Sequence, residues 1–283
     1  MDKNYTPLVT VGVPVKDGDK TLSSALDTIV NQTYKNIEII ISDNVSKDNT
    51  SKIIKEYSEK YENIIHIKQN KQLNSITHYQ NVFERANGKY FMFAADDDLR
   101  DKNYIETLVR GFDLFPNASI IFSDLVIFND YLSYKSTPIC DFDFQTQDLT
   151  FFKKIKLHFN GPFHIYGLIR TKYLLSYKWY DIDYGPDHPI LFHLLSHGDF
   201  VYVPGTTFYF WKPKEEKSIY ERAELYSLRK LSGFYKLKLV TTCLKTMLPS
   251  MDILDLLWKP FFLFFYLLYY IKGGLRGIIF WWR

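Results

Sequence analysis

The sequence predicts an α/β fold in which a mostly parallel sheet carries helices on both faces. Strand-like and helix-like segments alternate between residues 8 and 95, as is typical of such sheets. The first two strand-like segments are mostly apolar, which indicates strands buried on both faces. Polar or acidic residues follow three of these strands, at residues 14–17, 43–44 and 96–98. Because ligands bind such sheets outside the carboxyl ends of the strands, the sequence predicts a site at this edge.

Buried runs and helical spacing predict the elements of the first half. Strands are expected at residues 8–13, 37–42, 63–68 and 90–95, and a helix follows each of the first three. Pro14 is expected to end the pairing of the first strand, because proline cannot donate to the ladder. Asp19 is expected to cap the first helix, in which Leu22, Leu26 and Ile29 follow the helical period.

The second half is less regular. It predicts a helix at residues 103–115, a strand at 119–128, a loop at 130–147 and a helix at 189–195. Two short strands are expected at residues 200–203 and 206–211, on either side of Pro204 and Gly205. From about residue 221 the chain becomes basic and aromatic, which predicts C-terminal amphipathic helices. We therefore divide the chain into residues 1–130, 131–220 and 221–283.

The composition indicates which partners and which cellular compartment to expect. A net charge of +3 is too small to indicate nucleic acid as a partner. The two cysteines, Cys140 and Cys243, give no disulfide framework, so a reducing cytosol is expected. No apolar run long enough for a signal peptide precedes the first strand. Aromatic residues make up 18% of the chain, which fits a carbohydrate-facing groove or a surface that contacts a membrane.

The acidic triplet Asp96, Asp97 and Asp98 ends the fourth strand. Adjacent carboxylates repel one another unless a cation or donor groups lie among them. Mg²⁺ and Mn²⁺ prefer such hard oxygen ligands, and Mg²⁺ usually takes one or two carboxylates together with water and substrate phosphates. The alternative is a solvated acidic turn. The chain has no G-x-G-x-x-G or Walker motif, and Asp101 and Thr107 exclude an EF-hand loop, so the pattern favours a nucleotide held by side chains and a metal.

Five further sequence features and the acidic triplet are interpreted as one pattern. They are VGVPV at residues 11–15, NQTY at 31–34, SDNVSKDNT at 42–50, Asn81, GKY at 88–90 and the triplet, which contains a DXD motif. Together they resemble a family 2 glycosyltransferase of the Rossmann-like GT-A fold, over about residues 5–130. The resemblance implies a hexosyltransferase-type enzyme (EC 2.4). It further implies a nucleotide-sugar donor, with a UDP-sugar expected, Mn²⁺ or Mg²⁺ as cofactor, and inversion at the anomeric carbon.

The resemblance also implies roles for single residues, and it makes residues 1–130 the nucleotide-sugar-binding half. The residues expected to bind the donor are Pro14, Val15, Asp17, Asp43, Asn81, Asp96 and Asp97. Within this set, Asp43 is expected to hydrogen-bond the base and Asp96 to lie near the ribose and the metal. Asp98 is the expected metal ligand on the donor diphosphate.

Two positions depart from the family pattern. Asn44 stands where a second Asp is common, and Gln80 stands where an Arg is common. Both departures change the charge near the donor, so the base and the sugar stay open.

Asp187 resembles the catalytic base of the family and begins the helix expected near residue 189. Its local pattern also fits a simple helix cap, because a carboxylate is favoured at a helix start. Asp181 and Asp183 are the fallback candidates for the base. His193 and His197 are four residues apart and suggest a zinc site, but without an H-E-x-x-H motif the pattern disfavours zinc.

Residues 131–220 are expected to bind the acceptor and supply the base. Aromatic faces suit the apolar sides of sugar rings, so Phe163, His164, Tyr166 and Trp211 are candidate acceptor contacts, with ordinary core packing as the alternative. Lys212, Lys214 and Lys217 are candidates for stabilising the leaving diphosphate.

The basic, aromatic tail at residues 221–283 predicts membrane association. Residues 225–283 carry nine Lys or Arg against two acids. The uncharged run at residues 260–271 spans only about 18 Å as a helix, against a hydrocarbon core of about 30 Å. A helix in the headgroup region of the inner face of the cell membrane is therefore expected, with a re-entrant hairpin or a dimer interface as alternatives.

These expectations combine into one function. The chain is expected to be an inverting, metal-dependent, non-processive glycosyltransferase of the bacterial surface-glycan type, since it has no Q-x-x-R-W motif. The acceptor is expected to be a hydroxyl of a lipid-linked or surface-polysaccharide glycan, such as a lipopolysaccharide core. The alternatives are a non-catalytic glycan-binding or scaffolding protein and a sugar nucleotidylyltransferase.

Overall fold

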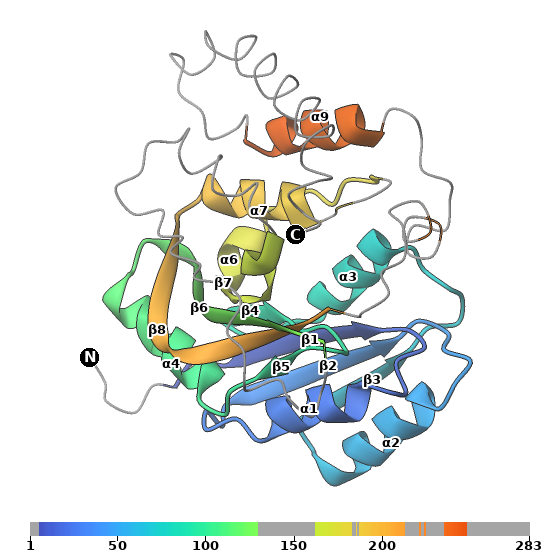
Figure 1. Ribbon diagram of the computed structural model, residues 1–283. Helices are drawn as coiled ribbons and strands as arrows, with labels where there is room; N and C mark the ends of the chain where they lie inside the picture. The colour runs from blue at the N-terminus through green and yellow to red at the C-terminus, as the bar shows by residue number, and fades with distance from the viewer. Residues whose placement is uncertain are drawn as a thin grey trace, which may run out of the picture.

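The computed structural model describes residues 6–129, 162–182, 185, 187–212, 221, 224 and 235–247. Within them, strands and helices alternate along the first half, and the second half adds long curved strands (Figure 1). The elements are β1 (Val9–Val15), α1 (Leu22–Val30), β2 (Ile37–Asp43), α2 (Thr50–Lys60), β3 (Ile64–Lys68), α3 (Ser75–Phe83), β4 (Tyr90–Phe93), β5 (Leu99–Arg100), α4 (Tyr104–Leu114), β6 (Ala118–Phe128), the 3-10 helix η2 (Pro162–Tyr166), β7 (Leu168–Arg170), α6 (Thr171–Leu174), α7 (Asp187–Leu195), β8 (Asp199–Trp211) and α9 (Tyr235–Met247).

The described strands form one mixed sheet in the order β3-β2-β1-β4-β7-β6-β8-β5. β1 is parallel to β2 and β4, β2 to β3, and β6 to β8. β7 runs antiparallel to β4 and β6, and β5 runs antiparallel to β8. The predicted mostly parallel α/β sheet is therefore confirmed. β5 and β7 were not predicted, because two and three residues are too few for a periodic pattern.

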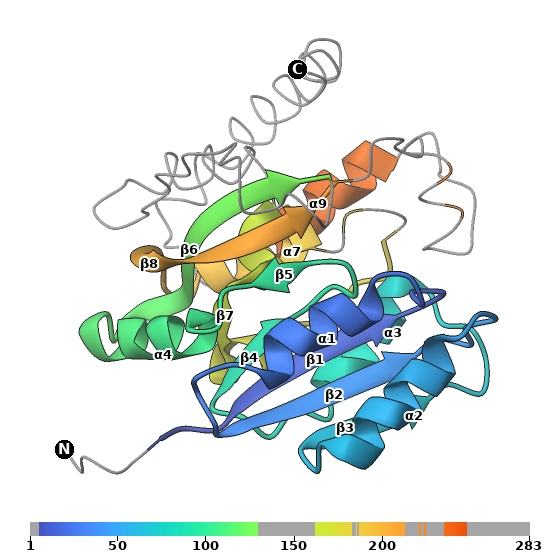
Figure 2. The same cartoon turned by 60° about the horizontal axis from the view of Figure 1, so that its bottom comes forward.

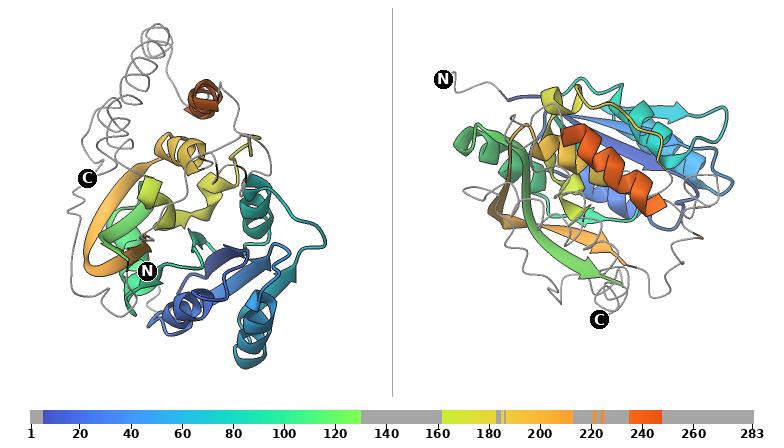
Figure 3. Two further views of the ribbon diagram at one scale, coloured as in Figure 1. Left: turned by 45° about the vertical axis from the view of Figure 1, so that its right-hand side comes forward. Right: turned by 90° about the horizontal axis from the view of Figure 1, so that it is seen from above.

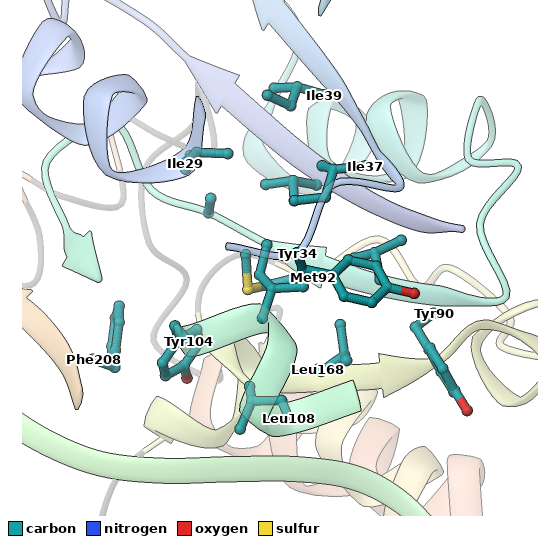
Figure 4. Packing of buried hydrophobic residues seen from close by; sticks show 14 of the residues in the cluster. Ile29, Tyr34, Ile37, Ile39, Tyr90, Met92, Tyr104, Leu108, Leu168 and Phe208 are labelled. Atoms are coloured by element: carbon teal, nitrogen blue, oxygen red, sulfur yellow. The ribbon is translucent and has the colours of Figure 1, made fainter. Parts of the chain in front are cut away.

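Two apolar cores lie on opposite faces of this sheet. Val11, Ile39 and Ile41 belong to the core that includes buried residues of α1, α2 and α4. Ile40 and Phe91 belong to the other core, with residues of α3, η2 and α7. Figure 4 shows the first core from close by. This alternation confirms the predicted helices on both faces.

The first strand continues through Pro14, so the prediction that Pro14 ends its pairing is wrong. Pro14 lies opposite Ser42 of β2, and β1 ends only at Val15. The amide of Ala94 donates to Gly12 O on the β4 side, and the amide of Asn44 donates to Val15 O on the β2 side. Because the backbone groups of successive strand residues point to alternate sides, the backbone nitrogen of Pro14 points toward β4. β4 ends at Phe93, and the missing N–H of Pro14 therefore costs no ladder hydrogen bond.

Asp19 does not cap the first helix as predicted. α1 begins at Leu22 with Thr21 as its N-cap residue. The Asp19 carboxylate instead accepts a hydrogen bond from the Asn49 amide (3.3 Å), and the Asp19 amide donates to Asp48 (3.0 Å). The loops after β1 and β2 are thus fastened to each other at the carboxyl edge of the sheet.

The two short strands expected around Pro204 and Gly205 are one bent strand, β8. Gly205 has a positive φ of 98°, which a glycine adopts without strain. The register with β6 shifts between Phe122 and Asp124, and the Ser123 hydroxyl donates to the carbonyls of Val203 and Thr206 (2.5 and 2.7 Å). β6 and β8 curve strongly as a pair (Figure 2). This curvature brings the end of β8 to the short strand that follows the acidic triplet.

Helix α9, within the predicted tail, packs on α7 (Figure 3). Its side chains Leu239, Thr242, Cys243 and Thr246 are buried. In the described part of the chain, no helix is long and apolar enough to cross a membrane. The expectations for the loop at residues 130–147 and for residues 248–283 lie outside the described residues.

Candidate active site

Asp98 lies between β4 and β5 and is fully buried. Its Oδ1 accepts a hydrogen bond from the Trp211 amide (2.8 Å) at the end of β8. Its Oδ2 is buried and has no hydrogen-bond partner among the residues that the structure describes. Burial and the neighbouring Asp97 carboxylate raise the pKa of Asp98 well above its ordinary value. The site therefore holds a buried carboxylate oxygen that makes no hydrogen bond within the described residues.

Arg100 is the positive charge beside this carboxylate. It is 4% exposed, and its guanidinium lies 5.0 Å from the Phe208 ring centre. Its Nη2 makes a long contact with Phe93 O (3.5 Å), while its Nε and Nη1 have no partner within the described ranges. The Arg100 charge favours the ionised forms of Asp97 and Asp98, but one guanidinium does not balance three carboxylates.

Asp96 and Asp97 also have raised pKa values. Burial, with the Asp97 charge second, raises the pKa of Asp96 to about 7. Burial also raises the pKa of Asp97 to about 6. Asp96 packs against Gly18 in the loop after β1, where an added Cβ would lie 2.2 Å from its carboxylate oxygen. The glycine thus lets this loop approach the triplet closely.

The donor set of the triplet fits a divalent cation. Its oxygens are hard ligands, and Asp98 Oδ2 lacks a partner within the described ranges. The described residues contain no group of three or more His, Cys, Asp or Glu that could hold a metal ion. A Mg²⁺ or Mn²⁺ site at Asp98 and Asp96, completed by water and phosphate, stays a prediction.

The loops after β1 and β2 form one wall of the site. Asp17 has a positive φ of 53°, and its carboxylate accepts from the Lys47 amide (2.7 Å). Asp43 is fully buried, with Oδ1 bound to the Ser46 amide (2.9 Å) and Oδ2 bound to the Ser51 hydroxyl. A base reaches Asp43 only if this loop moves. The roles of Asp17, Asp43 and the buried Pro14 and Val15 toward a nucleotide stay predictions.

Asn44, the first departure from the family pattern, has a structural role. Its side-chain amide donates to Leu73 O (2.8 Å), and its carbonyl oxygen accepts from the Leu73 amide (2.8 Å). An aspartate in this place can accept but cannot donate. Asn44 therefore holds the loop before α3 against the loop after β2.

We expect Asn44→Asp to destabilise the protein by about 2 kcal/mol, because it leaves Leu73 O unpaired and buries a charge. Asn70→Asp is the matched control, because Asn70 is exposed in the loop between β3 and α3. Its expected change in stability is below about 0.5 kcal/mol. Urea unfolding measures both. Equal stabilities of the two variants would contradict this role.

A polar network links the end of β2 to α3. Gln69 Nε2 donates to Ser42 Oγ (3.0 Å) and to Asn81 Oδ1 (2.8 Å). His78 Nε2 lies 3.0 Å from Ser42 O and 2.9 Å from Ser42 Oγ. Asn81, a predicted donor contact, is thus placed beside this carboxyl edge. Burial lowers the pKa of His78 to about 4.

His78 gives the protein a pH-dependent stability. The pKa of the folded His78 lies below the ordinary value of 6.5, so the unfolded chain binds a proton at this residue at a higher pH than the folded chain does. The contribution of neutral His78 to the stability of the fold is therefore fully present above pH 6.5 and is lost as the pH falls toward 4. Wild type is expected to lose roughly 3 kcal/mol more than His78→Gln between pH 7 and pH 4. The raised pKa values of Asp96 and Asp97 act in the opposite direction, but both proteins contain them. Urea unfolding at the two pH values measures both losses. An equal loss of stability in wild type and in His78→Gln would refute this assignment.

Asp187 begins α7, as predicted. Its charge reaches Tyr79, whose pKa is raised by burial, then by Asp187, and then by all three triplet carboxylates. Tyr79 therefore lies within electrostatic range of Asp187 and of the triplet. Asp181 is exposed, and Asp183 lies outside the described residues. The position of Asp187 favours it as the base, which stays a prediction.

The candidate acceptor contacts lie in different surroundings. Phe163 packs on Phe210, with ring centres 4.9 Å apart. His164 is 5% exposed, and its ring lies 4.6 Å from the Phe122 ring, within the core. Tyr166 is partly exposed near Asp98 and Asp187, and the Trp211 amide binds Asp98. Tyr166 and Trp211 are therefore the best placed of the four for contact with a substrate.

The histidine pair that suggested zinc is engaged in packing α7. His193 Nε2 lies 2.9 Å from Tyr173 O and 3.1 Å from Ser176 Oγ, and His197 Nδ1 lies 2.8 Å from His193 O. Lys212 follows the Asp98 contact directly, and its amide donates to Phe128 O (2.8 Å). Lys214 and Lys217 lie outside the described residues, so the lysine roles stay predictions.

Sequence reasoning missed Tyr79 and Arg100 as parts of the site. Tyr79 shares the helical spacing of the apolar residues around it, which is the pattern of a core residue. Arg100 follows the triplet by two residues, but only the antiparallel pairing of β5 with β8 buries it beside Asp98. A basic residue two positions after the acidic triplet is the one signal in the sequence that indicates a partner charge.

Residues 10–171 match the family model described as glycosyl transferase family 2. Among curated relatives, the glycosyltransferase GlyA of Streptococcus pneumoniae is 36% identical over 102 residues, which make up 36% of this chain and 14% of GlyA. The minor teichoic acid biosynthesis protein GgaB of Bacillus subtilis is 32% identical over 120 residues, 41% of this chain and 13% of GgaB. The matched part is thus a small fraction of each relative.

Solved structures share the fold. S. aureus TarS 1–349 in complex with UDP-GlcNAc superposes with a TM-score of 0.62 at 14% identity, over 86% of this chain and 72% of TarS 1–349. The mannosyltransferase PcManGT from Pyrobaculum calidifontis, in complex with GDP-Man and Mn²⁺, superposes with a TM-score of 0.57 at 13% identity, over 87% and 73% of the two chains. These likenesses confirm the expected GT-A fold.

Proposed function

The chain belongs to glycosyl transferase family 2, a family of transferase enzymes, and from this premise we propose that it moves one sugar from a nucleoside-diphosphate donor to a glycan hydroxyl. One observation carries the proposal. The buried Oδ2 of Asp98 has no hydrogen-bond partner within the described ranges, and the charges of Asp98 and Asp187 both act on Tyr79, which supports a single site that holds both carboxylates.

The donor side rests on the triplet. Asp98 and Asp96 would hold Mn²⁺ or Mg²⁺, which supplies positive charge against the charge that grows on the departing diphosphate. The loops that carry Asp17 and Asp43 would hold the nucleoside. The two similar structures hold different nucleotides, UDP-GlcNAc and GDP-Man, so they support a nucleotide sugar without choosing the base. A UDP-sugar remains the first candidate to test.

The acceptor side rests on Asp187. The acceptor oxygen attacks the anomeric carbon while the bond from that carbon to the diphosphate oxygen breaks. The Asp187 carboxylate takes the proton that the acceptor hydroxyl loses. This direct displacement inverts the configuration of the anomeric carbon.

The acceptor is proposed to be a lipid-linked or surface-polysaccharide glycan. GgaB is named for teichoic acid biosynthesis, which supports a surface polymer. The excess of basic residues among residues 225–283 supports attraction to anionic lipids on the inner face of the cell membrane.

Deleting residues 251–283 is expected to release the protein from anionic vesicles, because it removes the uncharged aromatic run and its flanking basic residues. Vesicle co-sedimentation measures the release. A shorter deletion of residues 277–283 is the control, since it keeps residues 260–271. Sedimentation of the longer deletion with the vesicles would place the anchor elsewhere.

A thermal-shift screen tests the proposed function. A ligand that binds only the folded state raises the melting temperature. UDP-GlcNAc, UDP-glucose, UDP-galactose and GDP-mannose are compared with and without Mn²⁺. At least one is expected to raise the melting temperature by several degrees, and only with Mn²⁺. No shift with any of them would support the alternative, a non-catalytic protein that retains the fold.

A further inference from the structure

Two tyrosines, Tyr79 on α3 and Tyr166 at the end of η2, approach the site from different elements. The Tyr79 ring packs on Phe93, the last residue of β4 before the segment that leads to the triplet, with ring centres 5.1 Å apart. The Tyr166 ring lies 5.2 Å from Phe208. Phe208 is the register partner of Arg100, two residues beyond Asp98.

The same two tyrosines also approach Asp187. α7, which Asp187 begins, packs against η2, which Tyr166 ends. The charges of Asp98 and Asp187 act on both phenols, and Tyr79 also acts on Tyr166. Both tyrosines therefore lie within electrostatic range of the triplet and of Asp187.

Both tyrosine side chains are partly exposed, and neither hydroxyl makes a hydrogen bond within the described residues. Burial, together with the surrounding negative charge, raises the pKa of both phenols, so both stay protonated at neutral pH. A neutral phenol both donates and accepts a hydrogen bond, as does a sugar hydroxyl.

A direct displacement requires the transferred sugar to lie between the diphosphate and the base. Building on the proposed function, we propose that Tyr79 and Tyr166 form the subsite for the transferred sugar and hydrogen-bond its hydroxyl groups. The aromatic rings also offer faces for the apolar side of a pyranose. Tyr166, expected from the sequence to contact the acceptor, is thereby assigned to the donor sugar.

The test compares a nucleotide sugar with the nucleoside diphosphate that lacks the sugar. Binding of UDP-GlcNAc, UDP-glucose, UDP-galactose and GDP-mannose is measured by calorimetry with Mn²⁺, with UDP and GDP as references. Tyr79→Phe and Tyr166→Phe keep the rings and remove the hydroxyls. Tyr57→Phe on α2 is the matched control, because its hydroxyl bonds Asp27 and Ser23 away from the triplet.

Each site variant is expected to weaken binding of the nucleotide sugar about three- to tenfold, as for one lost hydrogen bond, and to leave binding of the diphosphate within about twofold. Unchanged sugar affinity in both variants, or an equal loss for sugar and diphosphate, overturns the subsite while the proposed function stands. If wild type binds none of the nucleotide sugars, the proposed function fails and the subsite fails with it.

Discussion

Asp98→Asn is expected to abolish Mn²⁺-dependent nucleotide binding, with a loss of affinity of at least about 100-fold. The carboxylate is the proposed metal ligand, and a neutral amide is a poor substitute for it. Asparagine keeps the shape of the side chain and the acceptor for the Trp211 amide, so the fold is expected to survive. Binding is measured by calorimetry with UDP and Mn²⁺.

The stability of the same variant separates a lost ligand from a lost fold. Burial and Asp97 raise the pKa of Asp98 well above its ordinary value, so an ionised Asp98 disfavours the metal-free protein. Asp98→Asn is therefore expected to be at least as stable as wild type without metal. Asp101→Asn is the control, because Asp101 accepts from the Tyr209 hydroxyl (3.1 Å) outside the triplet. Wild-type nucleotide affinity in Asp98→Asn would remove Asp98 from the metal site.

Asp187→Asn is expected to slow release of the nucleoside diphosphate from the donor by about 10²–10⁴-fold, as for a lost general base. Affinity for the donor is expected to stay within about twofold, because Asp187 is proposed to act on the acceptor hydroxyl and not on the diphosphate. Until the acceptor is known, water serves as acceptor, and release of UDP from the donor is the readout.

Asp181→Asn is the matched control for this prediction. Asp181 is a nearby exposed carboxylate and the fallback candidate for the base. It is expected to leave release of the diphosphate unchanged. If Asp181→Asn slows release and Asp187→Asn does not, the base has been assigned to the wrong residue.

The first half of the fold could be predicted because its signals are local. β1 and β2 are buried on both faces, so an unbroken apolar run marks each of them. The helices between them keep a helical spacing of apolar residues. Pro14 was misjudged because the cost of a missing N–H depends on the neighbouring strand, which the sequence does not show.

The second half and much of the site depend on tertiary contacts. β5 exists because β8 pairs with it, and this pairing buries Arg100 beside Asp98. Tyr79 has the spacing of a core residue, and only the packing of its ring on Phe93 of β4 brings it within electrostatic range of the triplet and of Asp187. The triplet itself was visible in the sequence, since three adjacent charges after a buried strand have no role in folding.

Crystals soaked with Mn²⁺ and the nucleotide that raises the melting temperature give the most direct test of the central claim. Anomalous scattering at the manganese edge locates the metal. The account predicts a manganese peak within bonding distance of Asp98 Oδ2, with the diphosphate bound to the same ion and Asp187 on the opposite side of the sugar. A peak away from the triplet, or a nucleotide bound without metal contact to Asp98, would contradict it.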